Sequence, residues 1–195
     1  MCSSDLVGWT GSYYGYRGYL KDLLLTCGMD FEFVGTRNEN SEGLVDRYKN
    51  YYGVSGWRIE YLSQDIEEGR CIPGDDYAKR VDIVVCLIGT NNITLSRAYN
   101  YECYEKLLDD LSLYFPTSRK ICATIIPLPV RDAYLTEEFC EDVRTLVVQK
   151  GFELCELNEG FPKPCTEYLV DGVHPNDEGY KYIADKFYRA ICSEK

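Results

Sequence analysis

Apolar segments with two different spacings alternate along this chain. Residues 83–88 are apolar at every position, without the polar alternation of a strand that faces water. Such a run is typical of a strand in a parallel sheet covered on both faces. Further strands are expected at residues 31–35, 120–126 and 152–157.

Helical spacing separates these strand-like runs. Leu20, Leu23 and Leu24 recur at helical intervals within residues 16–27, and Gly28 follows at a position suited to a helix C-terminus. The alternation indicates a doubly wound α/β fold in one domain, residues 1–195, with its functional loops at the carboxyl ends of the strands. Three more helices are expected, over residues 101–114, 136–150 and 176–192.

Length and charge limit the function classes. The 195 residues, 45% of them hydrophobic, are enough for one sizeable core. No apolar run approaches the roughly 18 to 20 residues that span a bilayer. The net charge of −11 opposes nucleic-acid phosphates and anionic membranes, so neither is an expected partner.

The ten cysteines do not predict a metal site. They form no Cys-x-x-Cys pair, and the chain has a single histidine, so we expect neither a metal nor a cofactor. Cys86 and Cys122 lie inside apolar strand-like runs, where a thiol behaves as a small hydrophobic group. Buried reduced thiols are therefore favoured over disulfides, which a secreted protein would permit.

That single histidine, His174, follows Asp171 by three residues on an expected loop. In such an arrangement the carboxylate accepts the imidazole Nδ1 proton while Nε2 faces a nucleophile, as in the triad of serine hydrolases. The pattern is short, and a loop histidine without a chemical role is the alternative. Any proton transfer that needs an imidazole must use His174.

Two loops supply candidate donors for an oxyanion hole. Gly56 offers a backbone N–H with no side chain in the way, and Asn91, directly after the run at residues 83–88, offers a side-chain amide. Each such donor stabilises a tetrahedral oxyanion by about 3 to 4 kcal/mol. A tight-turn glycine and a loop asparagine are the structural alternatives, but both occur here together with Asp171 and His174.

In this order the motifs resemble those of the SGNH, or GDSL-like, hydrolase family. The family has four conserved sequence blocks, and three of them can be matched here, to Gly56, Gly89-Thr90-Asn91 and Asp171-x-x-His174. The resemblance implies a flavodoxin-like three-layer α/β/α sandwich with a mostly parallel sheet, and hydrolysis of short acyl esters on sugars without a metal. It is strongest to the acetylxylan-esterase-like carbohydrate esterases, through residues 15–17, 31–35, 55–59 and 171–177.

The fourth block, which in the family carries the nucleophile as Gly-Asp-Ser, is altered here. Counting back from Gly15 through Gly8 places Cys2-Ser3-Ser4 on Gly-Asp-Ser, so the resemblance implies Ser4 as the nucleophile. A competing register matches Asp5 to the aspartate and puts Leu6 at the nucleophile position, which leaves no hydroxyl. We favour Ser4, because that register keeps the spacing to both glycines.

The implied mechanism assigns a role to each block. His174 removes the proton of Ser4 as its oxygen attacks the ester, and Asp171 orients the imidazole. The oxyanion is held by the N–H groups of Ser4 and Gly56 and by the Asn91 amide. The expected partner is an acetylated carbohydrate or another small ester.

Other residues near the motifs modify this interpretation. Asn92 stands where an aspartate often follows the family's asparagine, which changes a hydrogen bond beside the site. Tyr13, Tyr14, Tyr51 and Tyr52 flank the motif loops and would stack on sugar rings if exposed, while packing is the alternative for each.

The start of the chain lacks an expected element. Only residues 1–5 are available for a strand before the helix at 16–27, and a strand usually has roughly five to six residues. We therefore expect the first strand to be missing or truncated, and the chain as given to be poorly stable and weakly active. No signal peptide occurs in the chain as given, whereas the family resemblance favours an extracellular protein.

A second function class remains open. The altered first block and the short first strand also suit a catalytically impaired carbohydrate-binding or interaction protein on the same fold. The distance from Ser4 Oγ to His174 Nε2 distinguishes the two. A nucleotide-binding protein is disfavoured, because no Gly-x-Gly-x-x-Gly or Walker-type loop occurs.

Overall fold

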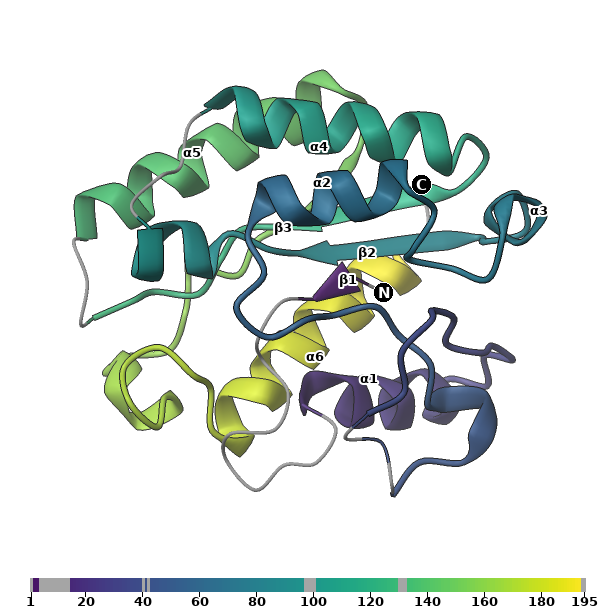
Figure 1. The fold of residues 1–195 in the computed structure, drawn as a ribbon. Helices are drawn as coiled ribbons and strands as arrows, with labels where there is room; N and C mark the ends of the chain where they lie inside the picture. Colours follow the sequence, from purple (N-terminus) through teal and green to yellow (C-terminus); the bar gives the residue numbers. More distant parts are fainter. Residues whose placement is uncertain are drawn as a thin grey trace.

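A four-stranded parallel sheet lies between two layers of helices (Figure 1). The computed structural model describes residues 2–3, 15–39, 41, 43–96, 101–129 and 133–193. The strand order is β1-β2-β3-β4, and every neighbouring pair is parallel. The predicted α/β sandwich is confirmed. The strands are β1 Cys2–Ser3, β2 Ile83–Leu87, β3 Arg119–Ala123 and β4 Glu153–Cys155.

The helices cover both faces of this sheet. In Figure 1, α2, α4 and α5 lie on one face and α1 and α6 on the other. The α-helices are α1 Gly15–Thr26, α2 Ile59–Glu67, α3 Asp75–Ala78, α4 Tyr101–Tyr114, α5 Ala133–Gln149 and α6 Asp177–Cys192. Short 3-10 turns occur at η1 Asp46–Tyr48 and η3 Cys165–Tyr168, and η2 Asn92–Ser96 is a π-helical turn.

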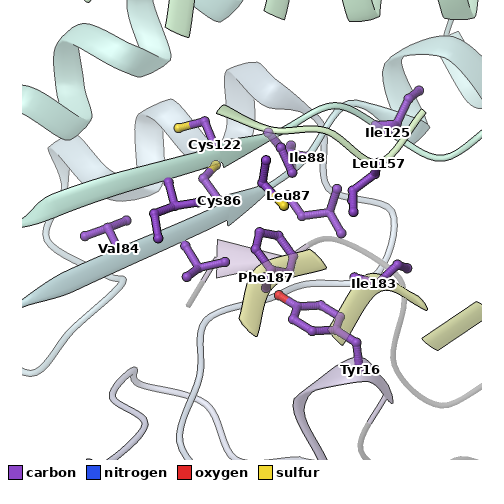
Figure 2. Packing of buried hydrophobic residues seen from close by; sticks show 14 of the residues in the cluster. Tyr16, Val84, Cys86, Leu87, Ile88, Cys122, Ile125, Leu157, Ile183 and Phe187 are labelled. Carbon is purple, nitrogen blue, oxygen red and sulfur yellow. The ribbon is translucent and has the colours of Figure 1, made fainter. Parts of the chain in front are cut away.

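The continuous apolar run of β2 is explained by contacts on both faces. Val84 and the three residues after it are buried. In Figure 2 the side chains of this strand lie beside Cys122 of β3, and Ile183 and Phe187 of α6 approach from the helical layer below. Tyr16 of α1 joins that layer, with its ring centroid 5.3 Å from that of Phe187. Burial of one such side chain contributes roughly 1.5 to 3 kcal/mol.

The predicted strand at residues 31–35 is wrong. The segment is not paired into the sheet, and the backbone N–H of Phe33 donates instead to the carbonyl of Arg47, at 2.9 Å. The apolar pattern marks this segment correctly as partly buried. A strand, however, is defined by a hydrogen-bonded neighbour, and that neighbour is not visible in a local pattern.

Two strands end earlier than predicted, and Thr124 is the reason. Its hydroxyl oxygen accepts from the backbone N–H groups of Leu157, at 2.8 Å, and Asn158, at 3.1 Å. The backbone N–H of Thr124 still donates to the Cys155 carbonyl, at 3.2 Å, and beyond this bond the Thr124 hydroxyl replaces the ladder. The predicted strands at 120–126 and 152–157 are correct in place and too long.

The first described strand, β1, lies beside the end of β2. Cys2 pairs with Cys86 and Ser3 with Leu87, so β1 follows only the carboxyl end of β2.

Thiol burial agrees with the prediction for the apolar runs. Cys86 and Cys122 are almost fully buried, as are Cys71, Cys140 and Cys155. Burial raises the pKa of the Cys140 and Cys155 thiols to about 12. Such thiols are poor nucleophiles at neutral pH. In the part of the chain that the structure covers, no helix combines the length and apolarity of a membrane span.

Candidate active site

Asp171 and His174 form a hydrogen-bonded pair on one loop. The loop is closed by a bridge between Leu169 and Pro175, and the N–H of Val170 donates to the His174 carbonyl at 2.8 Å. His174 Nδ1 lies 2.8 Å from Asp171 Oδ2. The contact expected from the Asp-x-x-His spacing is therefore present.

The second carboxylate oxygen of Asp171 also accepts hydrogen bonds. Its Oδ1 accepts from the backbone N–H groups of Val173, at 3.0 Å, and His174, at 2.8 Å. The intervening Gly172 has φ 80°, a left-handed conformation that glycine adopts readily. The carboxylate thus fixes both the backbone of the turn and the ring of His174.

These bonds lower the pKa of Asp171. Burial by itself raises the pKa of the carboxyl, but the hydrogen bonds from the His174 backbone, the His174 ring and the Val173 backbone outweigh it, and the pKa falls from 3.8 to about 2. Asp171 is ionised at neutral pH, and its carboxylate can only accept a hydrogen bond, here from the Nδ1–H group of His174. In the neutral ring the proton then sits on Nδ1, and Nε2 carries the lone pair of a general base.

The start of α6 anchors this loop. The Asn176 side chain caps the helix by accepting from the N–H of Gly179 at 3.1 Å, and it donates to the Glu167 carbonyl at 2.7 Å. Gly179 is required for close packing, since a Cβ there would lie 2.4 Å from the Tyr168 carbonyl oxygen. One asparagine therefore joins the segment before the loop of Asp171 and His174 to the helix after it.

Asn91 is bound to the turn that contains Gly56. Its side-chain Nδ2 donates to the backbone carbonyl of Trp57 at 3.0 Å, and the residue is 5% exposed. Gly56 has φ 78°, and a Cβ at this position would meet no atom within 4 Å. The two candidate oxyanion-hole residues thus lie on adjoining turns, although they are 35 positions apart in the chain.

Asn92 links the same turn to the start of α2. Its Oδ1 accepts from the backbone N–H of Ile59 at 3.0 Å, and its Nδ2 donates to Glu60 Oε2 at 2.9 Å. Glu60 also forms an ion pair with Arg58, at 3.1 Å. The side-chain oxygen of Asn92 therefore accepts from the first N–H of α2, and its side-chain nitrogen donates to the Glu60 carboxylate.

The turn after β2 also requires a glycine. Gly89 has φ 120°, and a Cβ there would lie 2.3 Å from Cζ of Phe139 on α5. Both the backbone conformation and the ring exclude a larger residue. Phe139 thereby fixes the path that leads from β2 to Asn91.

Asp65 holds the side chain of Trp57, next to Gly56, and the sequence analysis did not identify it. It is 1% exposed and accepts hydrogen bonds from the Tyr52 hydroxyl and the Trp57 indole N–H, while Arg70 pairs with its other oxygen. The residue that follows Gly56 is therefore tied to α2. A signal was available, because Asp65 is an acid on the apolar stripe of an amphipathic helix.

Arg17 has a structural role. It is 1% exposed, donates to the Lys49 carbonyl and to Ser41 Oγ at 3.1 Å each, and lies 3.8 Å above the ring of Tyr51. Burial lowers the pKa of the guanidinium. Tyr51 and Tyr52 are both buried, so the packing alternative is correct for them and sugar stacking is wrong.

The remaining candidates lie outside the described residues. These include Ser4, the competing Asp5 and Leu6, and the tyrosines Tyr13 and Tyr14. Ser3, the last described residue before Ser4, pairs with Leu87 at the carboxyl end of β2, four positions before Asn91 in the chain. Within the ranges that the structure covers, no group of three or more His, Cys, Asp or Glu side chains is arranged to hold a metal ion.

Comparison with known families and curated proteins gives two matches. Residues 7–182 match the GDSL-like lipase/acylhydrolase family. A multidomain esterase from Ruminococcus flavefaciens is 27% identical over 203 residues, which cover 91% of this chain and 26% of that protein. The chain therefore spans only 26% of the length of this relative.

Solved structures show the same fold. A family 3 carbohydrate esterase from Clostridium thermocellum is 25% identical with a TM-score of 0.78, over 97% of this chain and 92% of that one. A family 3 carbohydrate esterase from Talaromyces cellulolyticus is 20% identical with a TM-score of 0.76, over 98% and 94% of the two chains. The second likeness concerns the fold alone.

Proposed function

Because the chain belongs to the GDSL-like lipase/acylhydrolase family, we propose that it is a serine esterase that removes short acyl groups, chiefly acetyl, from carbohydrate esters. The observation that carries this proposal is the pair formed by Asp171 and His174, with 2.8 Å between the carboxylate and Nδ1. An ionised aspartate at this distance holds the tautomer that a serine hydrolase needs.

Ser4 is the proposed nucleophile. Nε2 of His174 takes the Ser4 hydroxyl proton as the oxygen attacks the ester carbonyl, and Asp171 stabilises the imidazolium that forms. The imidazolium then protonates the leaving sugar hydroxyl. Water repeats the cycle on the acyl-enzyme, which releases the acid and restores Ser4. The assignment of Ser4 rests on its spacing to Gly8 and Gly15.

Gly56 and Asn91 are proposed to hold the oxyanion together with the backbone N–H of Ser4. The hydrogen bond from Asn91 to the Trp57 carbonyl supports this role, because it fixes the amide beside the Gly56 turn before substrate binds. An amide has a second N–H, which can donate to an oxyanion. Donors that are held in place beforehand cost no reorganisation during the reaction.

One named neighbour and the chain's own loops support the proposed substrate class. The similar Clostridium thermocellum structure is a family 3 carbohydrate esterase. The loops that carry the motifs are short, with no long apolar stretch for an acyl chain. Each methylene added to the acyl chain stabilises binding by at most about 0.8 kcal/mol, and only if it is fully buried. A site without an apolar channel therefore gains little from a longer acyl chain. Acetyl esters should therefore be cleaved much faster than octanoyl esters.

A labelling experiment tests the proposal. The purified protein is treated with a fluorophosphonate, the modified residue is located by mass spectrometry, and turnover of p-nitrophenyl acetate and acetylated xylan is measured. Ser4→Ala should abolish both label and turnover, whereas the neighbouring control Ser3→Ala should retain both. A folded protein that binds acetylated xylan but neither takes up label nor turns over ester would instead be the non-catalytic binding protein.

A further inference from the structure

Two thiols meet where α1 and α6 end. Cys27 directly follows α1, and Cys192 is the last residue of α6. A side-chain hydrogen bond joins the two thiols. Cys27 is exposed and Cys192 is half-buried, whereas the strand cysteines Cys86, Cys122 and Cys155 are buried. A dissolved reagent can therefore reach this pair, unlike the three buried thiols.

The two helices lie side by side on one face of the sheet and run in the same direction (Figure 1). Lys181 of α6 lies over the ring of Tyr19 of α1, with its Nζ 5.7 Å from the ring centroid. Both residues belong to the first halves of their helices, and the thiol contact lies at the other ends. A bond between the sulfurs would therefore join two helix ends that packing already holds together.

The end of α6 lies at the amino-terminal edge of the sheet. Arg119, the first residue of β3, donates to the carbonyls of Ala190 and Ile191, at 3.1 Å each. Asn91 of the candidate active site follows the carboxyl end of β2, at the opposite edge. The thiol pair is therefore separate from the candidate active site.

The backbone around each cysteine permits a disulfide. Both residues lie at helix ends, where the chain can adjust without a break in the helix, and Gly28 follows Cys27 with φ 80°. The Cys27 thiol donates to the Leu24 carbonyl at 3.1 Å, and this carbonyl also accepts from the N–H of Met29 at 3.1 Å. Loss of the thiol proton therefore leaves the carbonyl with a partner.

Tyr188 assists the pair from one turn before Cys192 on α6. Its hydroxyl hydrogen-bonds with both thiols. A hydroxyl that donates to a sulfur favours the thiolate, which is the form that attacks a disulfide. Burial and then the contact with Cys27 raise the pKa of the Cys192 thiol. Cys192 therefore keeps its proton at neutral pH, and the exposed Cys27 is the thiol that a dissolved disulfide meets.

We propose that Cys27 and Cys192 form an intramolecular disulfide on reaction with a small-molecule disulfide. The Cys27 thiolate attacks one sulfur of the reagent, whose S–S bond breaks and releases one thiol. The Cys192 sulfur loses its proton, attacks the mixed disulfide at Cys27 and displaces the second thiol. In total the two cysteines lose two electrons and two protons, which the reagent gains as it becomes two thiols.

The new bond would stabilise the fold. It closes a long loop of chain, from the end of α1 to the end of α6, and so restricts the unfolded chain more than the folded one. This proposal is independent of the proposed esterase function, because the pair lies at the other edge of the sheet.

Controlled oxidation of the full chain tests the pair. The purified protein is incubated with glutathione disulfide or, as the reduced reference, with dithiothreitol. Free thiols are then blocked with N-ethylmaleimide, and the peptides are mapped by mass spectrometry without reduction. A peptide that joins Cys27 to Cys192 should appear only after oxidation, and the oxidised monomer should have a Tm higher by about 4 °C or more.

Serine variants show which thiols are responsible. Cys27→Ser and Cys192→Ser should each abolish both the cross-link and the rise in Tm. Cys165→Ser is the matched control, because Cys165 is another partly exposed cysteine, and this variant should retain both.

Three results would overturn the proposal. The first is oxidised protein in which the two cysteines stay free or carry glutathione without a bond between them. The second is a bond that forms only between two chains, seen as a dimer in non-reducing electrophoresis. The third is a cross-link with an unchanged or lower Tm, because the bond would then strain the helix ends. None of these readouts depends on ester hydrolysis.

Discussion

Glu60 accepts a hydrogen bond from the buried side-chain amide of Asn92, with 2.9 Å between Oε2 and Nδ2. The other end of the same amide accepts from the backbone N–H of Ile59 at 3.0 Å. An aspartate at position 92 could still accept from Ile59, but it could not donate to a carboxylate. The two residues are therefore matched, and Glu60 accounts for an amide where the family resemblance led us to expect an acid.

Asn92→Asp should lower the free energy of unfolding by about 1 to 3 kcal/mol, because a buried carboxylate would then face that of Glu60. Glu60→Gln in the same chain should restore most of the loss, since its amide can donate to the new acid. Urea unfolding of the wild type, both single variants and the double variant measures the coupling. Strictly additive effects would contradict a direct contact.

Gly89→Ala should be more destabilising than an ordinary glycine substitution. The new Cβ would lie 2.3 Å from Cζ of Phe139, and φ is 120°. We expect a loss of at least about 2 kcal/mol from overpacking and backbone strain together. Gly151→Ala is the matched control, because φ is 73° there and a Cβ meets nothing within 4 Å. Equal losses in urea unfolding would show that Phe139 contributes nothing.

Local patterns predicted the features that depend on neighbours in the sequence. The run at residues 83–88 identified β2, because a strand buried on both faces needs no polar alternation. The pair formed by Asp171 and His174 followed from a three-residue spacing on one loop. The helix cap at Asn176 lies at the predicted start of the last helix.

Features that depend on distant residues were not predictable in this way. Asp65 holds the turn at Trp57 only because α2 packs beside it, and Arg17 reaches Ser41 across 24 positions. The segment at 31–35 has a strand-like sequence but no strand partner in the structure. Ser4 lies outside the described residues, so its role stays a prediction from spacing.

His174→Ala should lower ester hydrolysis at least roughly a thousandfold while the fold stays intact, since the members of a triad act as a unit. The reason is that the chain has no second imidazole to replace the proton acceptor. Initial rates with p-nitrophenyl acetate measure the effect, and circular dichroism checks the fold. Glu178→Gln, an exposed change on the first turn of α6, is the control and should keep wild-type rates. A folded His174→Ala protein with wild-type turnover would rule out the proposed mechanism.

Asp171→Asn should change how stability depends on acid pH. In the folded protein the pKa of Asp171 is about 2, below its ordinary value of 3.8. Between these values the unfolded chain binds more protons at this carboxyl than the folded one does. The stabilisation is therefore complete above about pH 4 and is lost as the pH falls toward 2. Wild-type Tm should accordingly fall more than that of Asp171→Asn between pH 5 and pH 2.

Thermal unfolding of both proteins across that range measures the difference. Glu178→Gln controls for the removal of one negative charge near the same loop, and its pH curve should follow the wild type. Because the Asp171 side chain is 41% exposed, solvent screening reduces the energy of its bonds, so the informative quantity is the shape of the curve. Parallel curves for wild type and Asp171→Asn would mean that the bonds from His174 and Val173 do not hold the carboxyl in its ionised form.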